Sequence, residues 1–204
     1  MAVLNCLTNE TTKLPIPKVK KFVEQKSQRE SWALIEFLEG ETLRTALYNE
    51  KNKEKRQELL FNFGNLLSQL HSTSCPNELM YERQWLDELL YQAEYNLKNY
   101  KVDGTEELLE RIKTNKPNVY KQTLIHGDFT IDNVLVSDGV ITGVIDWSAG
   151  AYGDPRYDLS LAMRPKPNAF ENETDKHIFF EGYGGKVIDK NVYDYFVNGL
   201  NEFF

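Results

Sequence analysis

The chain has 204 residues, 41% of them hydrophobic and 12% aromatic, which is enough for one large domain or two small lobes with a sizeable core. Its formal net charge of −7 argues against nucleic acid or an anionic membrane as the main partner. No apolar run approaches the length of a membrane span, and the N-terminal residues lack a basic segment followed by a long apolar one, so we expect a cytoplasmic protein.

The first expected elements are two short β-strands. After the prolines at positions 15 and 17, residues 19–24 and 32–38 read as strands, with the polar residues 25–30 as the turn between them. They should form an antiparallel pair that continues into residues 39–41. Its lysines are expected to form a solvated strand edge that discourages aggregation.

From Glu41 onward we expect a mainly helical region. Residues 56–71 carry an apolar stripe typical of a helix that faces a core, made of Leu59, Leu60, Phe63, Leu66, Leu67 and Leu70. Residues 81–100 and 105–113 are expected to form a second and a third helix, and residues 192–204 a last amphipathic one. The acidic side chains of the second and third helices are either solvated surface or part of a site for an amino-bearing substrate.

One histidine and the two cysteines were considered as metal ligands. His71 lies four residues before Cys75, but no further ligand accompanies them, and Cys6 is far away in the sequence. A histidine near the end of a helix more often caps carbonyl groups or interacts with the helix dipole. The cysteines are expected to be free thiols in a reducing compartment.

The most informative stretch lies between residues 124 and 161. Asp128 and Asn133 stand five residues apart on a loop that enters a short predicted strand, residues 133–136, and Asp146 ends the next one, residues 141–145. The residues between these strands include Asp-Gly, which predicts a tight hairpin. A hairpin brings its ends together and would place Asn133 and Asp146 within reach of one cation.

That set of oxygen-bearing side chains suits phosphoryl transfer. Mg²⁺ is usually held by one or two protein groups together with substrate phosphates, and Asn133 and Asp146 could be those groups. Asp128 is then free to face an attacking hydroxyl and to accept its proton. The spacing of Asp128 and Asn133 also arises by chance in turns. Asp146 is harder to explain in that way, because it ends an apolar run where a buried carboxylate would be costly without a cation.

These residues carry a resemblance to a known family. His126-Gly127-Asp128 with Asn133, then Ile145-Asp146-Trp147, Gly153-Asp154-Pro155 and Asp158-Leu159, resemble the aminoglycoside phosphotransferase family of protein-kinase-like small-molecule kinases. The resemblance implies an α+β, protein-kinase-like fold with a truncated β N-lobe and a mainly helical C-lobe. The division implied is residues 1–40 for the partial β lobe and hinge, and residues 41–204 for the catalytic lobe.

The resemblance also implies roles for single residues. Asp128 would be the catalytic aspartate, Asn133 and Asp146 the magnesium ligands, and ATP or GTP the phosphate donor. The other implied positions are the Glu36 carbonyl and the Leu38 amide for the nucleotide base, His126 and Asp158 as supports of the catalytic loop, and Glu202 and Phe204 at the acceptor. Asp154 and Pro155 fit the start of a helix.

The sequence departs from the family in its nucleotide lobe. Kinases of this type hold the phosphates with a glycine-rich loop and a strand lysine, and none of the twelve glycines lies in a G-x-G-x-x-G arrangement. Residues 182–185, Gly-Tyr-Gly-Gly, lack the Lys-Ser or Lys-Thr of a P-loop and are expected to be a turn between helices. Asn201 stands where the family has an acidic residue near the acceptor.

Three functions fit these observations. The leading hypothesis is magnesium-dependent transfer of the γ-phosphate of ATP or GTP to a hydroxyl of a small molecule, aminoglycoside-like or another amino or sugar alcohol. The alternative is a truncated kinase-like module that binds nucleotide with weak or no catalysis. A metal-assisted hydrolase using the same carboxylates is a third class, for which the sequence offers no further metal ligands. The acceptor and the oligomeric state stay open.

Overall fold

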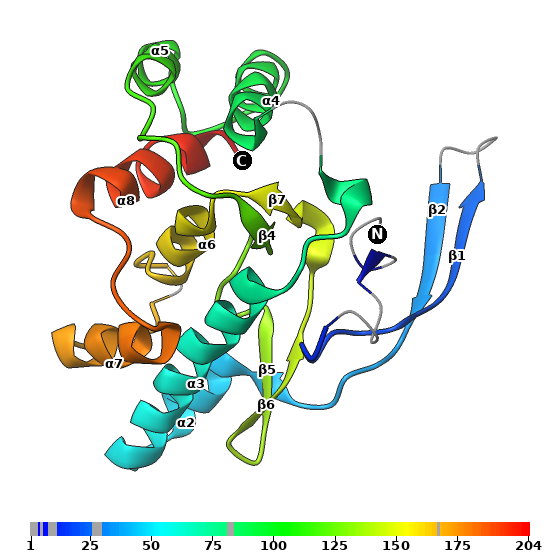
Figure 1. The fold of residues 1–204 in the computed structure, drawn as a ribbon, viewed down its shortest axis with the longest axis vertical. Helices are drawn as coiled ribbons and strands as arrows, with labels where there is room; N and C mark the ends of the chain where they lie inside the picture. Colours follow the sequence, from blue (N-terminus) through cyan, green and yellow to red (C-terminus); the bar gives the residue numbers. More distant parts are fainter. Residues whose placement is uncertain (1–3, 5, 8–11, 26–29, 81–83, 167) are drawn as a thin grey trace.

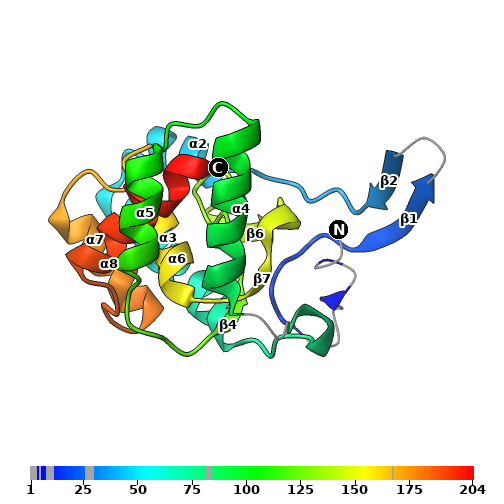
Figure 2. The same ribbon diagram turned by 90° about the horizontal axis from the view of Figure 1, so that it is seen from above.

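The computed structural model describes residues 4, 6–7, 12–25, 30–80, 84–166 and 168–204. It shows a body of helices and short strands from which one β-hairpin projects (Figure 1). Figure 2 shows the same hairpin standing clear of the helices when the molecule is viewed from above. The first described residues lie between this hairpin and the body.

The projecting hairpin is the predicted antiparallel pair. Strand β1 spans Val19–Gln25 and β2 spans Glu30–Ile35, with Phe22 opposite Ala33. The second strand ends three residues earlier than expected, and residues 36–40 form a linker to the body. That linker begins with a hydrogen bond from the Glu36 amide to the Lys18 carbonyl, 2.8 Å.

The strands of the body form two small antiparallel sheets. One has the order β3-β5-β6, and the other pairs β4 with β7. Their bounds are β3 Glu41–Thr42, β4 Thr123–Ile125, β5 Val134–Ser137, β6 Val140–Val144 and β7 Ala151–Gly153. The hairpin predicted around residue 138 is therefore confirmed as β5 and β6, with Val134 opposite Val144. Its turn residues, Asp138 at φ 51° and Gly139 at φ 78°, both lie in the left-handed region that two-residue hairpins require.

This turn allows a first prediction. Gly139→Ala should lower the free energy of unfolding by about 1–2 kcal/mol, because a Cβ at positive φ is strained even though nothing lies within 4 Å of that position. Asp138→Gly is the matched control and should be neutral or stabilising, since glycine adopts positive φ freely. Urea unfolding of the three proteins measures the difference. Equal stabilities for the two variants would show that the turn does not hold the hairpin.

The helices confirm most of the expected elements, correct one of them and add another. Their bounds are α2 Leu43–Asn49, α3 Lys53–Ser72, α4 Trp85–Asn99, α5 Glu106–Thr114, α6 Pro155–Ala162, α7 Glu173–Tyr183 and α8 Lys190–Val197, with short 3₁₀ turns η1 Asn77–Leu79, η2 Trp147–Ala149 and η3 Leu200–Phe203. The expected single helix over residues 192–204 is wrong, because Gly199 leaves the helical region and separates α8 from η3. Helix α7 was not foreseen. The turn expected over residues 182–185 is shorter than expected, because Gly182 and Tyr183 still belong to α7 and Gly184 caps the helix at φ 99°.

Helix α3 is the centre of the core. All six residues of its predicted apolar stripe are buried. It crosses α7 at very close range, since a Cβ on Gly64 would lie 2.0 Å from the Phe179 carbonyl oxygen. Phe63 stacks on Phe129 with ring centroids 4.9 Å apart. Because Phe129 directly follows Asp128, this stack fixes the loop that carries the candidate site onto the main helix.

The two cysteines form no disulfide in the described structure. Cys6 and Cys75 are both free thiols, and burial, with the nearby Cys6 as a smaller cause, raises the pKa of Cys75 to about 11. Among the described residues, no group of three or more histidine, cysteine or acidic side chains could hold a metal ion. No helix in the described part of the chain is both long and apolar enough to cross a membrane.

Candidate active site

The candidate site lies on the loop between β4 and β5. Helix α6 holds this loop through hydrogen bonds to its backbone. Asp154 caps α6 by accepting a hydrogen bond from the Arg156 amide, with Pro155 at the first helical position as expected. One turn later, the fully buried Asp158 accepts hydrogen bonds from the amides of His126 at 2.7 Å and Gly127 at 2.8 Å. The structure thus brings Asp158 to the position inferred from the resemblance.

His126 joins the same loop to the end of β6. Its Nε2 donates to the Ile145 carbonyl at 2.9 Å, because a carbonyl can only accept. In a neutral ring Nδ1 is then an acceptor, and it receives the Asp128 amide at 3.2 Å. The ring is buried and packs on Trp147, with centroids 4.8 Å apart. These contacts fit His126 as a support of the loop.

The sequence did not reveal two side chains, His71 and Tyr183, that support Asp158 from the interior of the protein. His71 lies 3.3 Å from Asp158 Oδ2 through Nε2 and 2.9 Å from the Tyr183 hydroxyl through Nδ1. Burial is the main cause that raises the pKa of Tyr183, so its hydroxyl stays protonated and can donate to His71. His71 lies in the last turn of α3, as expected, but its ring contacts Tyr183 and Asp158 and, among the described residues, caps no carbonyl group of the helix. The partners are 112 residues apart in sequence, so no local signal could have found them.

Asp128 is partly exposed, and both of its carboxylate oxygens have a neighbour. Asn133 Nδ2 donates to Asp128 Oδ2 at 2.9 Å and to its backbone carbonyl at 2.8 Å. Because Nδ2 makes both contacts, the Asn133 Oδ1 atom remains available as an oxygen ligand. On the other side, Arg164 Nη2 lies 3.6 Å from Asp128 Oδ1. Arg164 follows α6, and the sequence reasoning did not select it.

Asp146 reaches the site through the hairpin. The Ile145 amide donates to the Asn133 carbonyl at 2.9 Å, which fixes the residue before Asp146 directly opposite Asn133. The expectation that Asp146 would be buried in an apolar run is wrong: its side chain is exposed. The strand ends at Val144, and the left-handed backbone of Asp146, φ 59°, turns its side chain out of that run. Ser148 Oγ donates to its Oδ1 at 2.8 Å.

A pocket of about 620 Å³ joins Asp146 to the linker that follows the N-terminal hairpin. Its lining includes residues 35–38 and residues 145–148. Within the described ranges, neither the Glu36 carbonyl nor the Leu38 amide has a hydrogen-bond partner in the chain. A mostly apolar cleft that offers a free backbone donor, a free backbone acceptor and a carboxylate suits a planar base attached to phosphates.

The two C-terminal candidates lie in a segment whose backbone is held by α4 and by Gly104. The Glu202 carbonyl accepts the Gly104 amide at 2.8 Å, and the Phe203 carbonyl accepts from Asn96 of α4 at 2.9 Å. Phe204 is more than half exposed. In the part of the chain that the structure describes, no hydrogen bond or ion pair links Glu202 or Phe204 to Asp128.

Comparisons with known proteins agree with this geometry. Residues 1–189 match the phosphotransferase enzyme family (APH). An aminoglycoside 3'-phosphotransferase of Enterococcus faecalis is 28% identical over 184 residues, which cover 85% of this chain and 68% of that protein. The crystal structure of aminoglycoside-3'-phosphotransferase of type VIII superposes with a TM-score of 0.75 at 21% identity, over 94% of this chain and 75% of the other.

A second solved structure shares the fold at lower similarity. A thermostable mutant of aminoglycoside phosphotransferase APH(4)-Ia, in a ternary complex with ADP and hygromycin B, matches with a TM-score of 0.57 at 20% identity. The match covers 78% of this chain and 58% of that one. The α+β, kinase-like fold inferred from the sequence is thereby confirmed. The chain belongs to the phosphotransferase enzyme family.

Proposed function

We propose that this protein transfers the γ-phosphate of ATP or GTP to a hydroxyl group of a small molecule with the help of Mg²⁺. The observations that carry the proposal are the hydrogen bond from Asn133 to Asp128 and the hairpin β5-β6, which pairs Asn133 with Ile145, the residue before Asp146. Support also comes from the relatives, which are named aminoglycoside 3'-phosphotransferases, and from the structure solved with ADP and hygromycin B.

The proposed roles follow from the contacts. Asp128, held by Asn133 and Arg164, would orient the acceptor hydroxyl and take its proton as the new bond forms. Asn133 Oδ1 and the Asp146 carboxylate would hold the metal, which neutralises charge on the phosphates when bound. The Glu36 carbonyl and Leu38 amide would receive the base of the nucleotide in the 620 Å³ pocket.

Two further expectations belong to this proposal. Residues 1–40 would act as a partial nucleotide lobe with its hinge, and residues 41–204 as the catalytic lobe. A nucleotide-binding module with weak or no catalysis is the second candidate, because the pocket of about 620 Å³ suits a nucleotide base whether or not transfer follows. Both candidates predict nucleotide binding. Measurable transfer of the γ-phosphate to an acceptor would therefore favour the first candidate over the second.

Asp146→Asn tests the metal role directly. We expect it to weaken binding of Mg-ADP or Mg-GDP by about tenfold or more, because a charged ligand is replaced by a neutral amide. Asp138→Asn, in the turn of the same hairpin, is the matched control, and asparagine tolerates its positive φ. Calorimetric titration with and without Mg²⁺ provides the measurement. A loss of affinity that is equal in the presence and absence of Mg²⁺ would refute a metal role for Asp146.

A further inference from the structure

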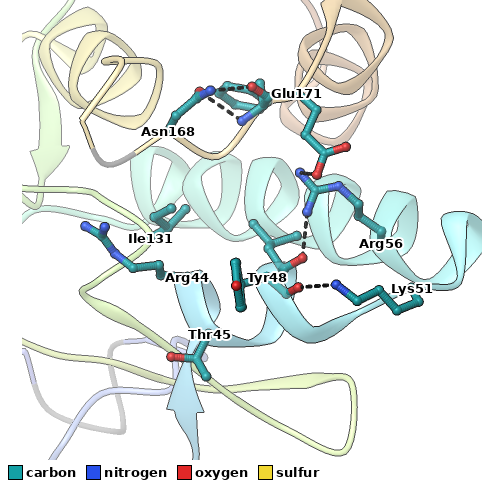
Figure 3. Close-up of a pocket in the computed structure, with 10 residues that line it drawn as sticks. Arg44, Thr45, Tyr48, Lys51, Arg56, Ile131, Asn168 and Glu171 are labelled. Atoms are coloured by element: carbon teal, nitrogen blue, oxygen red, sulfur yellow. Dashed lines mark hydrogen bonds and ion pairs between the residues drawn. The ribbon is translucent and has the colours of Figure 1, made fainter.

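A second pocket of about 560 Å³ lies beside the catalytic loop, on the side of α2 (Figure 3). It is lined by α2, by the first turn of α3, by Ile131 of the loop and by residues 168–171. Its volume is in the range of small-molecule sites. It is separate from the nucleotide pocket, because the two have no lining residue in common.

This pocket holds several cationic side chains, and two of them are paired with carboxylates. Its described lining includes three cationic side chains, Arg44, Lys51 and Arg56, and one acidic side chain, Glu171, whereas the chain carries a net charge of −7. The Arg56 side chain is largely buried, and it pairs with Asp175 at 3.5 Å and with Glu171 at 3.4 Å. Its charge is therefore balanced within the protein.

Lys51 is open to a ligand, whereas Arg44 keeps one free nitrogen beside its partner Asp132. Lys51 has no ion-pair partner among the described residues, and its Nζ donates one hydrogen bond, to the Tyr48 carbonyl at 3.0 Å. Arg44 pairs with Asp132 through Nε and Nη2, which leaves Nη1 free, and its side chain is half exposed. The hydroxyl-bearing Thr45 and Tyr48 line the same wall. Figure 3 shows Arg44 and Lys51 flanking Tyr48 along α2 and the segment that follows it.

Two chain segments connect this pocket to Asp128. Ile131, in the lining, is three residues after Asp128, so their Cα atoms are at most about 11 Å apart. Arg164 lies beside the Asp128 carboxylate, and Asn168, also in the lining, is four residues further along the chain. Both segments that border Asp128 thus lead into the pocket.

We propose that this pocket binds the anionic group, a phosphate or a carboxylate, of the acceptor molecule. The inference rests on the proposed function and adds the substrate class: a hydroxyl compound that carries negative charge at the end remote from the reacting hydroxyl. Arg44 and Lys51 supply charge-assisted donors, and Ile131 and Phe170 supply an apolar surface for the body of the ligand.

The site can be tested without any catalysis, with inorganic phosphate as the probe. Titration of the protein in chloride buffers of constant ionic strength should show phosphate binding, and Lys51→Ala should raise its Kd by about tenfold. Lys53→Ala is the matched control, since Lys53 is an exposed neighbour outside the lining, and should change the Kd by less than about twofold. Asp146→Asn should leave phosphate binding unchanged, which separates this site from the proposed metal site.

Two results would overturn the proposal. Absence of phosphate binding, or binding equally tight in wild type and Lys51→Ala, would show that no anion site exists here. A panel of hydroxyl acceptors in which only neutral or cationic compounds are phosphorylated would show that the pocket does not receive the acceptor, while leaving the proposed phosphotransferase function intact. Preferred transfer to acceptors bearing phosphate or carboxylate, reduced selectively by Lys51→Ala, is the expected outcome.

Discussion

Asp128→Asn is expected to reduce phosphoryl transfer by about 10²- to 10⁴-fold, the usual contribution of a positioned general base. The amide cannot accept the acceptor's proton, and it places a donor where a carboxylate oxygen now faces Asn133 or Arg164. Since Asp128 is partly exposed, the substitution should leave the fold intact, and since Asp128 is not a proposed metal ligand, nucleotide affinity should change little.

The assay is transfer of labelled γ-phosphate from ATP and from GTP to a panel of hydroxyl acceptors, with Mg²⁺ present or chelated. Asp138→Asn is again a suitable control, because it makes the same chemical change at an exposed turn of the neighbouring hairpin. Transfer that is as fast in Asp128→Asn as in wild type would refute the proposed chemistry. Loss of transfer together with loss of Mg-nucleotide binding would instead show that Asp128 acts as a metal ligand.

Asp158→Asn is expected to lower the free energy of unfolding by about 3–5 kcal/mol, as does removal of one partner from a buried charged network. The fully buried carboxylate accepts from the amides of His126 and Gly127 and lies beside His71. The side-chain NH₂ group of an asparagine would face a backbone N–H group that now donates to the carboxylate. That N–H group would then be buried without an acceptor.

Urea unfolding measures this loss, and hydrogen exchange locates it. The amides of residues 126 and 127 should exchange faster in the Asp158→Asn variant than in wild type. Amides in the middle of α4 should lose only as much protection as the fall in global stability accounts for. A variant as stable as wild type would show that Asp158 does not anchor the loop. Phosphoryl transfer should fall together with loop protection, because Asp128 would lose its fixed backbone.

Local sequence signals predicted the parts of the fold whose hydrogen bonds are local. The Asp-Gly turn fixed the position of the β5-β6 hairpin, and the leucine and phenylalanine spacing identified the buried face of α3. Strands β3, β4 and β7 have only two or three residues, so their existence depends on remote partners and leaves no periodic pattern. The break between α8 and η3 occurs at a single glycine within an otherwise amphipathic run.

The candidate site was predicted to the same extent. Asp128, Asn133 and Asp146 could be selected because they flank a hairpin, and the hairpin brings the last two to opposite strand ends. His71 and Arg164 could not be selected, since each meets its aspartate only through the packing of distant segments. The exposure of Asp146 depends on one left-handed backbone conformation, which side-chain patterns do not reveal.

The most direct test of the central claim is a crystal structure of the protein with Mg²⁺ and a non-hydrolysable nucleotide. The account predicts one Mg²⁺ ligated by Asn133 Oδ1 and an Asp146 carboxylate oxygen at about 2.0–2.1 Å each, with the nucleotide base against residues 36–38. A metal-nucleotide complex bound with neither side chain in its coordination shell would contradict the account.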